Sequence, residues 1–356
     1  MIFGKAKSLA GLDIGDNSIK VVELKDLGKG RGQQLMGLAL EALPSDAIVD
    51  GSIMDSGLVV DGIRRAFEKG KIKNKNVATA LSGHSVIIKR INLPVMSREE
   101  LAESIRWEAE QYVPYDIEDV NIDYQVLEGV SLSGEGNMDV LLAAVKKDRI
   151  NDYTSVIAQA GLNPVVLDVD AFALQNVFEA NYDIDPREIV ALIDMGASVT
   201  TIVIMKGGNS VFWRDISIGG NQYTDAIQKE LNLTAEQAEK LKCGEDLEKV
   251  SFESVFPIIS SVTSDTITEI QKTIDFFRAT TATEEPIGRM LITGGASQIY
   301  NLKQAFAERL GASVELLNPF RKIIANTRDF PPELLNKMSS SASVAVGLAL
   351  RKVGEK

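Results

Sequence analysis

The sequence predicts an α/β protein of several domains in which one architecture is used twice. Its 356 residues exceed what a single ordinary core accommodates, which favours about two to four domains. Short β-type runs alternate with helical stretches along the chain, as is typical of an α/β protein. A strand–turn–strand motif also recurs after about half the chain, which indicates an internal duplication.

The composition excludes several classes of protein. Fifty acidic residues against 38 basic ones give a net charge of -12, which argues against nucleic-acid binding. Cys243 and His84 are the only cysteine and histidine, too few for a disulfide and unfavourable for a zinc site. No apolar run approaches the roughly 20 residues that span a bilayer, and no secretory signal is visible. We therefore expect a cytoplasmic protein that does not insert into the membrane and reaches it through protein partners.

The first half opens with a predicted β-hairpin. Strand-forming runs at residues 9–14 and 19–24 flank a turn at residues 15–18. This strand–turn–strand order differs from the strand–turn–helix order of a Rossmann fingerprint or a P-loop. After it, apolar spacing and β-branched runs predict one helix and two strands, at residues 58–69, 77–81 and 86–91.

An acidic segment interrupts the first half. Between Arg98 and Asp123 there are nine acidic residues and two basic ones. Ser97 followed by Glu100 forms a capping-box pattern that predicts the start of a helix. Two strands joined by a Gly/Ser-rich hairpin around residues 133–137, then a helix and a strand, complete the segment. The sequence therefore predicts a small α+β insert.

The second half repeats the strand-rich beginning of the first. Four strands are expected at residues 189–193, 199–205, 211–216 and 290–292. The last strand leads through two glycines into a helical stretch, and residues 343–352 read as a well-packed terminal helix.

The repeated hairpin contains residues that suit a phosphate and a metal ion. Aligning the two copies places Asp13 over Asp194 and Gly15 over Gly196. A carboxylate at a strand end can hold a divalent cation directly or through water, and the glycine lets backbone N–H groups turn toward phosphate oxygens. Side-chain donors follow in both copies, namely Asn17 and Ser18 in the first, and Ser198 or Thr200 in the second. Two such hairpins across a cleft would hold a triphosphate and its Mg²⁺ from both sides.

A third glycine-rich element strengthens this interpretation. In residues 292–297 a strand runs into a helix through Gly294 and Gly295, a turn that allows close approach of a planar or phosphate-bearing ligand. Helix capping by Ser297 would explain the same residues. Lys20 either neutralises phosphate charge or faces solvent. Each element alone is weak evidence for a nucleotide-binding site. Their joint occurrence at this spacing indicates a nucleotide cleft.

In this order the three elements resemble the phosphate-1, phosphate-2 and adenosine motifs of the actin/Hsp70/hexokinase-like ATPases. Over nearly its whole length the chain is similar to the PilM family of pilus-assembly proteins, relatives of the cell-division protein FtsA. This resemblance implies a duplicated actin-like (ribonuclease H-like) α/β fold with four subdomains. The implied boundaries are 1–84, 166–188 and 326–356 for subdomain 1A, 85–165 for 1C, 189–224 and 286–325 for 2A, and 225–285 for 2B.

The resemblance also implies bound ATP and Mg²⁺, with slow hydrolysis or none. Asp170 lies where this superfamily has an acidic or amide residue near the attacking water, although an aspartate there more often caps a turn. Glu239 and Lys242 match a 2B helix whose side chains reach ribose and adenine, and otherwise resemble an exposed ion pair. Asp13 and Asp194 would hold the metal, through water. The full set expected to bind the nucleotide is Asp13, Gly15, Asn17, Ser18, Lys20, Asp194, Gly196, Ser198, Thr200, Glu239, Lys242, Gly294, Gly295 and Ser297.

Partners are implied as well. The N-terminal cytoplasmic tail of a PilN-type membrane protein would lie in a groove between 1A and 1C, where an acidic rim favours a basic tail. Other platform and motor proteins of the pilus would also bind, and the protein would act as a scaffold at the inner face of the inner membrane, for a pilus or a related secretion system. Two alternatives are an FtsA-like tether, disfavoured because no cationic amphipathic helix follows the terminal helix, and a small-molecule kinase, for which no acceptor site is visible.

Overall fold

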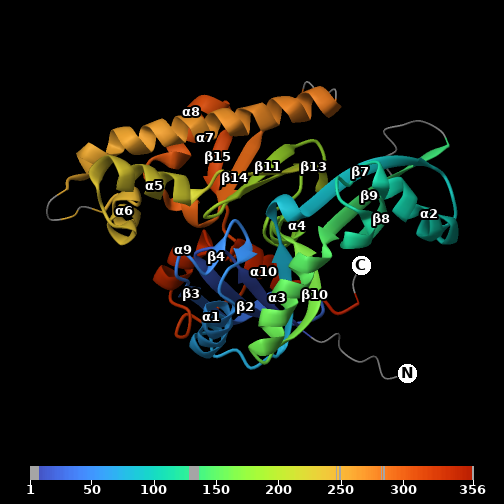
Figure 1. The fold of residues 1–356 in the computed structure, drawn as a ribbon, viewed down its shortest axis with the longest axis horizontal. Coiled ribbons are helices and arrows are strands. Elements are labelled where there is room, and N and C mark those ends of the chain that lie inside the picture. The colour runs from blue at the N-terminus through green and yellow to red at the C-terminus, as the bar shows by residue number, and fades with distance from the viewer. Residues whose placement is uncertain are drawn as a thin grey trace.

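The computed structural model describes residues 8–127, 136–245, 247, 250–281, 283 and 285–354. Two five-stranded sheets form its body (Figure 1). The first sheet contains β1 (Ala10–Ile14), β2 (Ser18–Asp26), β3 (Gln33–Ala42), β6 (Asn76–Leu81) and β10 (Asn163–Val169). The second contains β11 (Ile189–Met195), β12 (Thr200–Lys206), β13 (Asn209–Ile216), β14 (Arg289–Thr293) and β15 (Ser313–Leu316).

The two sheets have the same topology. Their orders are β10-β6-β1-β2-β3 and, read in the same direction, β15-β14-β11-β12-β13. In each, three strands form an antiparallel meander, and two more strands extend the sheet in parallel from its first strand. The hairpin turns also match, because Gly15 N–H donates to the Ser18 carbonyl at 3.1 Å and Gly196 N–H donates to the Val199 carbonyl at 2.9 Å. The predicted α/β class and the duplication are confirmed.

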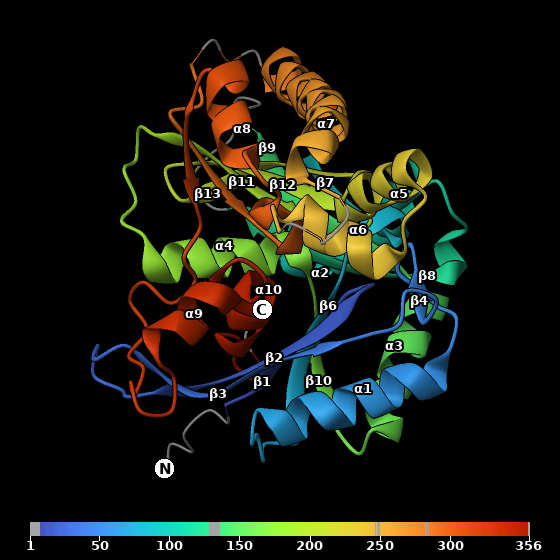
Figure 2. The ribbon, with the colours of Figure 1, turned by 90° about the vertical axis from the view of Figure 1, so that its left-hand side faces the viewer.

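Helices separate and cover the sheets (Figure 2). The outer face of the first sheet packs on α1 (Ser56–Lys69) and α3 (Lys147–Gln159). Two helices lie between the sheets, α4 (Asp170–Asn181) and α10 (Ser343–Ala349). The outer face of the second sheet packs on α5 (Gly220–Leu231), α7 (Phe252–Thr281) and α8 (Leu302–Leu310). This middle layer packs against both sheets.

The central helix α10 approaches its neighbours at backbone distance. A Cβ added at Gly11 in β1 would lie 1.9 Å from the Ala345 carbonyl oxygen, and one added at Gly347 would lie 2.0 Å from the Ala173 carbonyl oxygen. Every residue of α10 is buried, so the terminal helix expected from the sequence belongs to the core. The other short elements are β4 (Ile48–Val49), β5 (Ser52–Ile53), η1 (Gly83–Ser85), η2 (Ile117–Asp119), α6 (Ala235–Lys242), η3 (Gly295–Gln298) and α9 (Pro332–Ser339).

The insert folds around a core of its own. Its sheet has the order β7-β9-β8, and α2 packs on it. These elements span β7 (Val86–Pro94), α2 (Arg98–Glu110), β8 (Val120–Leu127) and β9 (Asn137–Lys146). The predicted capping box is present, since Ser97 accepts from Glu100 N–H and Glu100 accepts from Ser97 N–H. The predicted hairpin around residues 133–137 lies mostly outside the described residues.

This structural unit is shorter than the predicted insert at 85–165. It ends at Lys146, because β10 pairs in parallel with β6 and so belongs to the first sheet. A parallel pairing requires a crossover, and α3 provides it by packing back on the outer face of the first sheet. Within the described part of the chain, no helix is both long and apolar enough to cross a membrane.

Candidate functional site

The two repeated turns lie against each other at the carboxyl ends of β1 and β11. The Ser198 hydroxyl donates to the Asp16 carboxylate. The Asn17 amide donates to Asn221 Oδ1 at 3.0 Å, and the Asn221 amide donates to Ser198 Oγ at 3.2 Å. The Ser198–Asp16 and Asn17–Asn221 hydrogen bonds join residues more than 180 positions apart across the two halves. The repeated hairpins therefore meet directly through these hydrogen bonds, whereas the sequence pattern predicts a cleft between them.

Strand alternation directs both repeated aspartates toward the space between the sheets. Along β11, Ala191 and Ile193 pack on the outer helices, whereas Leu192 belongs to the middle layer. Asp194, two residues after Leu192, shares its face. Asp13 likewise shares the face of Gly11, which packs on α10. The two carboxylates thus point into the junction between the halves.

Negative charge accumulates at this junction. Burial and, to a smaller extent, the charge of Asp13 raise the pKa of Asp194 to about 7, while Lys20 opposes the shift. Burial also raises the pKa of Asp170 well above its usual value, with added repulsion from Asp13, and the pKa of Asp215 is raised by burial as well. Lys20 pairs with Asp13 at 3.3 Å. This excess of carboxylates suits a bound cation.

The donor set fits a magnesium ion that keeps its water. Within the part of the chain that the structure describes, no group of three acidic, histidine or cysteine side chains converges to form a metal cage. Mg²⁺ usually retains several waters and binds through one or two carboxylates together with substrate phosphates. The carboxylates of Asp13 and Asp194 have the donor chemistry to hold such an ion through water.

The raised pKa of Asp194 predicts a pH-dependent stability. Its pKa moves from 3.8 to about 7, so the folded, unliganded protein retains a proton that the unfolded chain releases. This stabilising contribution is fully present below about pH 4 and is lost as the pH rises through about 7. We expect Asp194→Asn to remove this loss and to be more stable than the wild type at about pH 8. Urea unfolding without nucleotide or metal measures the free energy of unfolding of both proteins at several pH values. Parallel profiles of this free energy against pH would contradict the prediction.

The third glycine-rich element packs on the end of β11. Gly294 has φ +87°, and a Cβ there would lie 2.2 Å from the Met195 carbonyl oxygen. Gly295 differs, because a Cβ there would meet nothing within 4 Å. Ser297 is buried and its hydroxyl donates to the Gly294 carbonyl at 2.7 Å, so it stabilises the turn. It does not cap a helix, because it lies within η3 and the N-cap residue of α8 is Asn301. Gly295 is thus the position in this element that leaves room for a ligand.

Lys242 is buried, so its interpretation as half of an exposed ion pair is wrong. Its Nζ lies 2.6 Å from Glu239 Oε1 and donates to the Thr224 hydroxyl at 2.9 Å and to the Gly220 carbonyl at 3.3 Å. Gly220 N–H in turn donates to the Gly196 carbonyl at 2.9 Å. The Glu239–Lys242 pair of α6 is therefore connected to the second repeated turn. The spacing of these residues in the sequence does not predict this connection.

Thr200 does not face the junction between the halves. It is fully buried, and its hydroxyl donates to the Ile218 carbonyl at 2.6 Å. Of the two alternatives in the second hairpin, the geometry favours Ser198. In the first hairpin, a Cβ at Gly15 would lie 3.0 Å from Lys20 Nζ, the end of a flexible side chain that can move aside.

Three residues of the site escaped the sequence analysis. Asp16 accepts from Gly51 N–H at 3.1 Å as well as from Ser198, and Asn221 bridges the two turns. Asp215, on β13, accepts from the Thr201 hydroxyl at 2.7 Å. Asp16 and Asn221 each stand beside a predicted glycine turn, which is the one signal that could have identified them.

Element η1 connects the first sheet, the insert and the second half. Gly83 N–H donates to Asp215 at 2.6 Å, and His84 Nε2 lies 2.7 Å from the Ser217 hydroxyl. From the other side, the Tyr115 hydroxyl of the insert donates to the His84 carbonyl at 2.9 Å. Element η1 thus provides a hydrogen-bonded contact between both halves and the insert.

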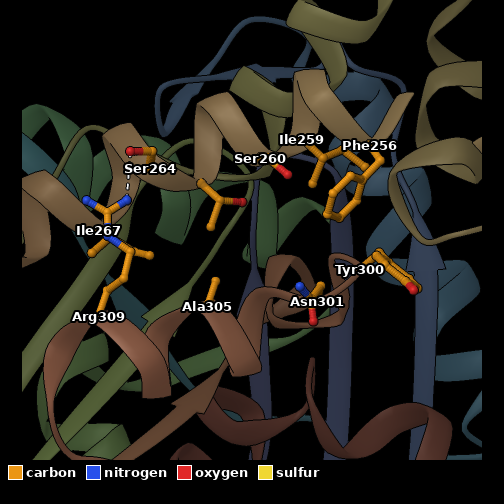
Figure 3. A pocket seen from close by; sticks show the side chains of 10 residues that line it. Phe256, Ile259, Ser260, Ser264, Ile267, Tyr300, Asn301, Ala305 and Arg309 are labelled. Carbon is orange, nitrogen blue, oxygen red and sulfur yellow. Dashed lines mark hydrogen bonds between the residues drawn. The ribbon is translucent and has the colours of Figure 1, made fainter. Parts of the chain in front are cut away.

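Two hollows lie on the second half. One of about 130 Å³ opens between α7 and α8, where Phe256 and Tyr300 lie at one end and Arg309 at the other (Figure 3). The other, of about 500 Å³, runs along α8 and is bordered by Ser297 and Cys243. Ser297 is the one predicted site residue that lines either hollow.

Comparison with known proteins identifies the family. Residues 11–353 match the model of the type IV pilus assembly protein PilM. A chain of a solved PilM-PilN type IV pilus biogenesis complex superposes with a TM-score of 0.85 at 28% identity, over 98% of this chain and 100% of that one. Cell division protein FtsA of Bacillus subtilis (strain 168) is 25% identical over 258 residues, which are 65% of this chain and 56% of FtsA.

Fold similarity extends further. The solved structure of MreB5 of Spiroplasma citri bound to ADP superposes with a TM-score of 0.51 at 13% identity, over 93% of this chain and 98% of that one. This likeness shows a shared actin-like fold. Since the family match covers nearly all of the sequence, this chain belongs to the PilM family of type IV pilus assembly proteins.

Proposed function

We propose that this protein is a cytoplasmic ATP-binding scaffold of type IV pilus assembly that holds the N-terminal cytoplasmic tail of a PilN-type inner-membrane protein. The full-length similarity to a chain of a PilM-PilN complex carries the proposal. Other platform and motor proteins of the pilus would bind to the remaining surface of this protein. The alternatives, an FtsA-like tether and a kinase, lack comparable support, since the FtsA match covers 65% of this chain.

The nucleotide would bind between the two repeated turns. The turns at residues 15–18 and 196–199 would face the phosphates, and Gly295 would leave room for the nucleoside. Asp13 and Asp194 would hold magnesium through water, and the ion would supply positive charge that neutralises the phosphates. The carboxylate excess of the junction supports this placement, and MreB5, which shares the fold, is bound to ADP in its solved structure.

Asp170 is proposed to orient the water that attacks the terminal phosphate. It is the first residue of α4, beside Ser82, whose hydroxyl lowers its pKa against the larger effect of burial. Because burial raises the pKa of Asp170, the protonated form is favoured when no cation is bound, and a protonated carboxyl group cannot accept a proton from water. This supports slow hydrolysis or none.

The tail is proposed to bind between the first sheet and the insert, which correspond to subdomains 1A and 1C. Strand β10 lies at the edge of the first sheet, and β7 and β8 lie at the two edges of the insert sheet. An extended peptide can add to such an edge through main-chain hydrogen bonds. The second sheet and the α5–α7 region would be 2A and 2B.

A synthetic basic tail of a PilN-type protein should bind the wild type, with an affinity that falls as salt is added. Reversing two exposed acids of the insert, Asp119→Lys and Asp123→Lys, should weaken binding by about fivefold, because each rim charge contributes roughly 0.2–1 kcal/mol. Isothermal titration at two salt concentrations measures both effects. The salt dependence should also become shallower in this variant.

A matched variant separates this effect from the change in net charge. Glu253 and Glu315 are exposed on the second half, and reversing them to lysine alters the total charge equally. This control should bind the tail as the wild type does. Equal losses in both variants, or no loss in either, would remove the insert from the tail-binding surface.

A further inference from the structure

The hollow between α7 and α8 has an aromatic end. There the rings of Phe256 and Tyr300 meet edge to face with their centroids 6.2 Å apart, and both side chains are exposed. Ala305 lies between this end and the opposite one, and its small side chain leaves the middle of the hollow open (Figure 3). A volume of about 130 Å³ is of the order that holds one aromatic ring, since an engineered cavity of about 150 Å³ binds benzene. The hollow therefore has room for one large apolar side chain.

The opposite end of the hollow is basic. Arg309 is the one charged residue among the described residues that line it. Its guanidinium donates to the Ser264 hydroxyl at 2.7 Å, a neutral partner that leaves its charge available to an acid. Arg309 follows Ala305 by four residues, which is about one helical turn. A fitting occupant thus carries a large apolar side chain and, about one turn away from it, a carboxylate.

Helix α2 of the insert presents this combination on its outer side. Trp107 is 72% exposed, the largest exposed fraction among the large apolar side chains that the structure describes. Glu103 and Glu110, four residues before it and three after it, are exposed on the same side of the helix. The adjacent Arg106 pairs with Glu118 at 2.9 Å instead. Trp107 is therefore a projecting aromatic ring with a carboxylate about one turn away in each direction.

The two surfaces lie far apart within one molecule. The hollow follows the first half of α7, close to α6, whereas α2 lies at the other end of the longest axis (Figure 1). Trp107 therefore cannot enter the hollow of its own chain, but it can enter that of another copy. Such a contact joins two unlike surfaces, so each copy would offer its ring to one neighbour and its hollow to another.

We propose that a second copy of this chain docks through α2 in the hollow between α7 and α8. Trp107 enters between the aromatic end and Ala305, and the carboxylate of Glu103 or Glu110 pairs with Arg309. The contact is small and therefore weak in dilute solution. It does not depend on the proposed tail binding, although tails held in a membrane would raise the local concentration of the protein and favour the contact.

Sedimentation velocity of the full-length protein over a concentration series tests the proposal. The average sedimentation coefficient of the wild type should rise with concentration, and less so at high salt, because salt screens the charge pair. Trp107→Ser and Arg309→Glu should each raise the dissociation constant at least about tenfold, as is usual for aromatic and arginine anchors. Both side chains are exposed, so both variants should unfold in urea as the wild type does.

Mixing the two variants tests the pairing of unlike surfaces. Trp107→Ser retains the hollow, and Arg309→Glu retains the projecting ring. An equimolar mixture should form a dimer with one contact and grow no further, although neither variant associates alone. Adding Glu103→Lys and Glu110→Lys to the Arg309→Glu chain should restore association, because the charges of both surfaces are then reversed together.

A matched variant controls for the loss of an exposed apolar side chain. Met54 is 66% exposed on the first half, and Met54→Ser should associate as the wild type does. A wild type that stays monomeric at all concentrations, an equal loss in the Met54 variant, or a mixture that forms no dimer would overturn the proposal. Titration with the tail peptide is measured separately. Absent self-association with intact tail binding would therefore refute this inference alone.

Discussion

The Gly294→Ala variant is expected to be strongly destabilised, whereas Gly295→Ala should fold normally. At Gly294 the backbone has φ +87°, and a Cβ would lie 2.2 Å from the Met195 carbonyl oxygen and 2.5 Å from Asp194 Oδ1. Neither neighbour can move freely, because both belong to the end of a central strand. Backbone strain and overlap together should lower the free energy of unfolding by about 3–5 kcal/mol.

The neighbouring glycine provides the control. A Cβ at Gly295 meets nothing within 4 Å, so its alanine variant should stay within about 0.5 kcal/mol of the wild type in urea unfolding. The same variant should nevertheless bind ATP less tightly if the nucleoside occupies this space. Equal stabilities of the two variants would contradict the close packing of this element on β11.

The Asp13→Asn and Asp194→Asn variants are expected to lose affinity for Mg-ATP. Each change removes a carboxylate that would hold the hydrated metal, which should weaken binding by about 1–3 kcal/mol, or roughly five- to 150-fold. Isothermal titration with ATP in the presence of magnesium, and again with a chelator, isolates the contribution of the metal. The loss should appear in the first titration and be small in the second.

An exposed carboxylate serves as the matched control for this experiment. Asp46 lies on the surface of the first half, and Asp46→Asn should bind Mg-ATP as the wild type does. Unchanged affinity in both Asp13→Asn and Asp194→Asn would remove the nucleotide from the junction between the halves. Since Asp194→Asn should also be more stable than the wild type at about pH 8, lost binding in a more stable protein cannot be attributed to unfolding.

Much of the fold could be predicted because its signals are local. The two hairpins depend on a glycine and its neighbours, and the same backbone hydrogen bond closes both turns. The start of α2 depends on Ser97 and Glu100, one turn apart. Even the meeting of the turns follows from the repeat, since equivalent strands occupy equivalent places in two sheets of the same topology.

The sequence alone thus determined the class of the fold, its duplication and the two aspartates at the centre of the proposed site. Only the tertiary structure decided that β10 returns to the first sheet, that Lys242 is buried and that the Thr200 hydroxyl donates to the Ile218 carbonyl. The physical reason is the separation along the sequence of the residues that interact. Strands and turns arise from residues close together in the chain, whereas burial and hydrogen-bond partners depend on which distant elements pack together.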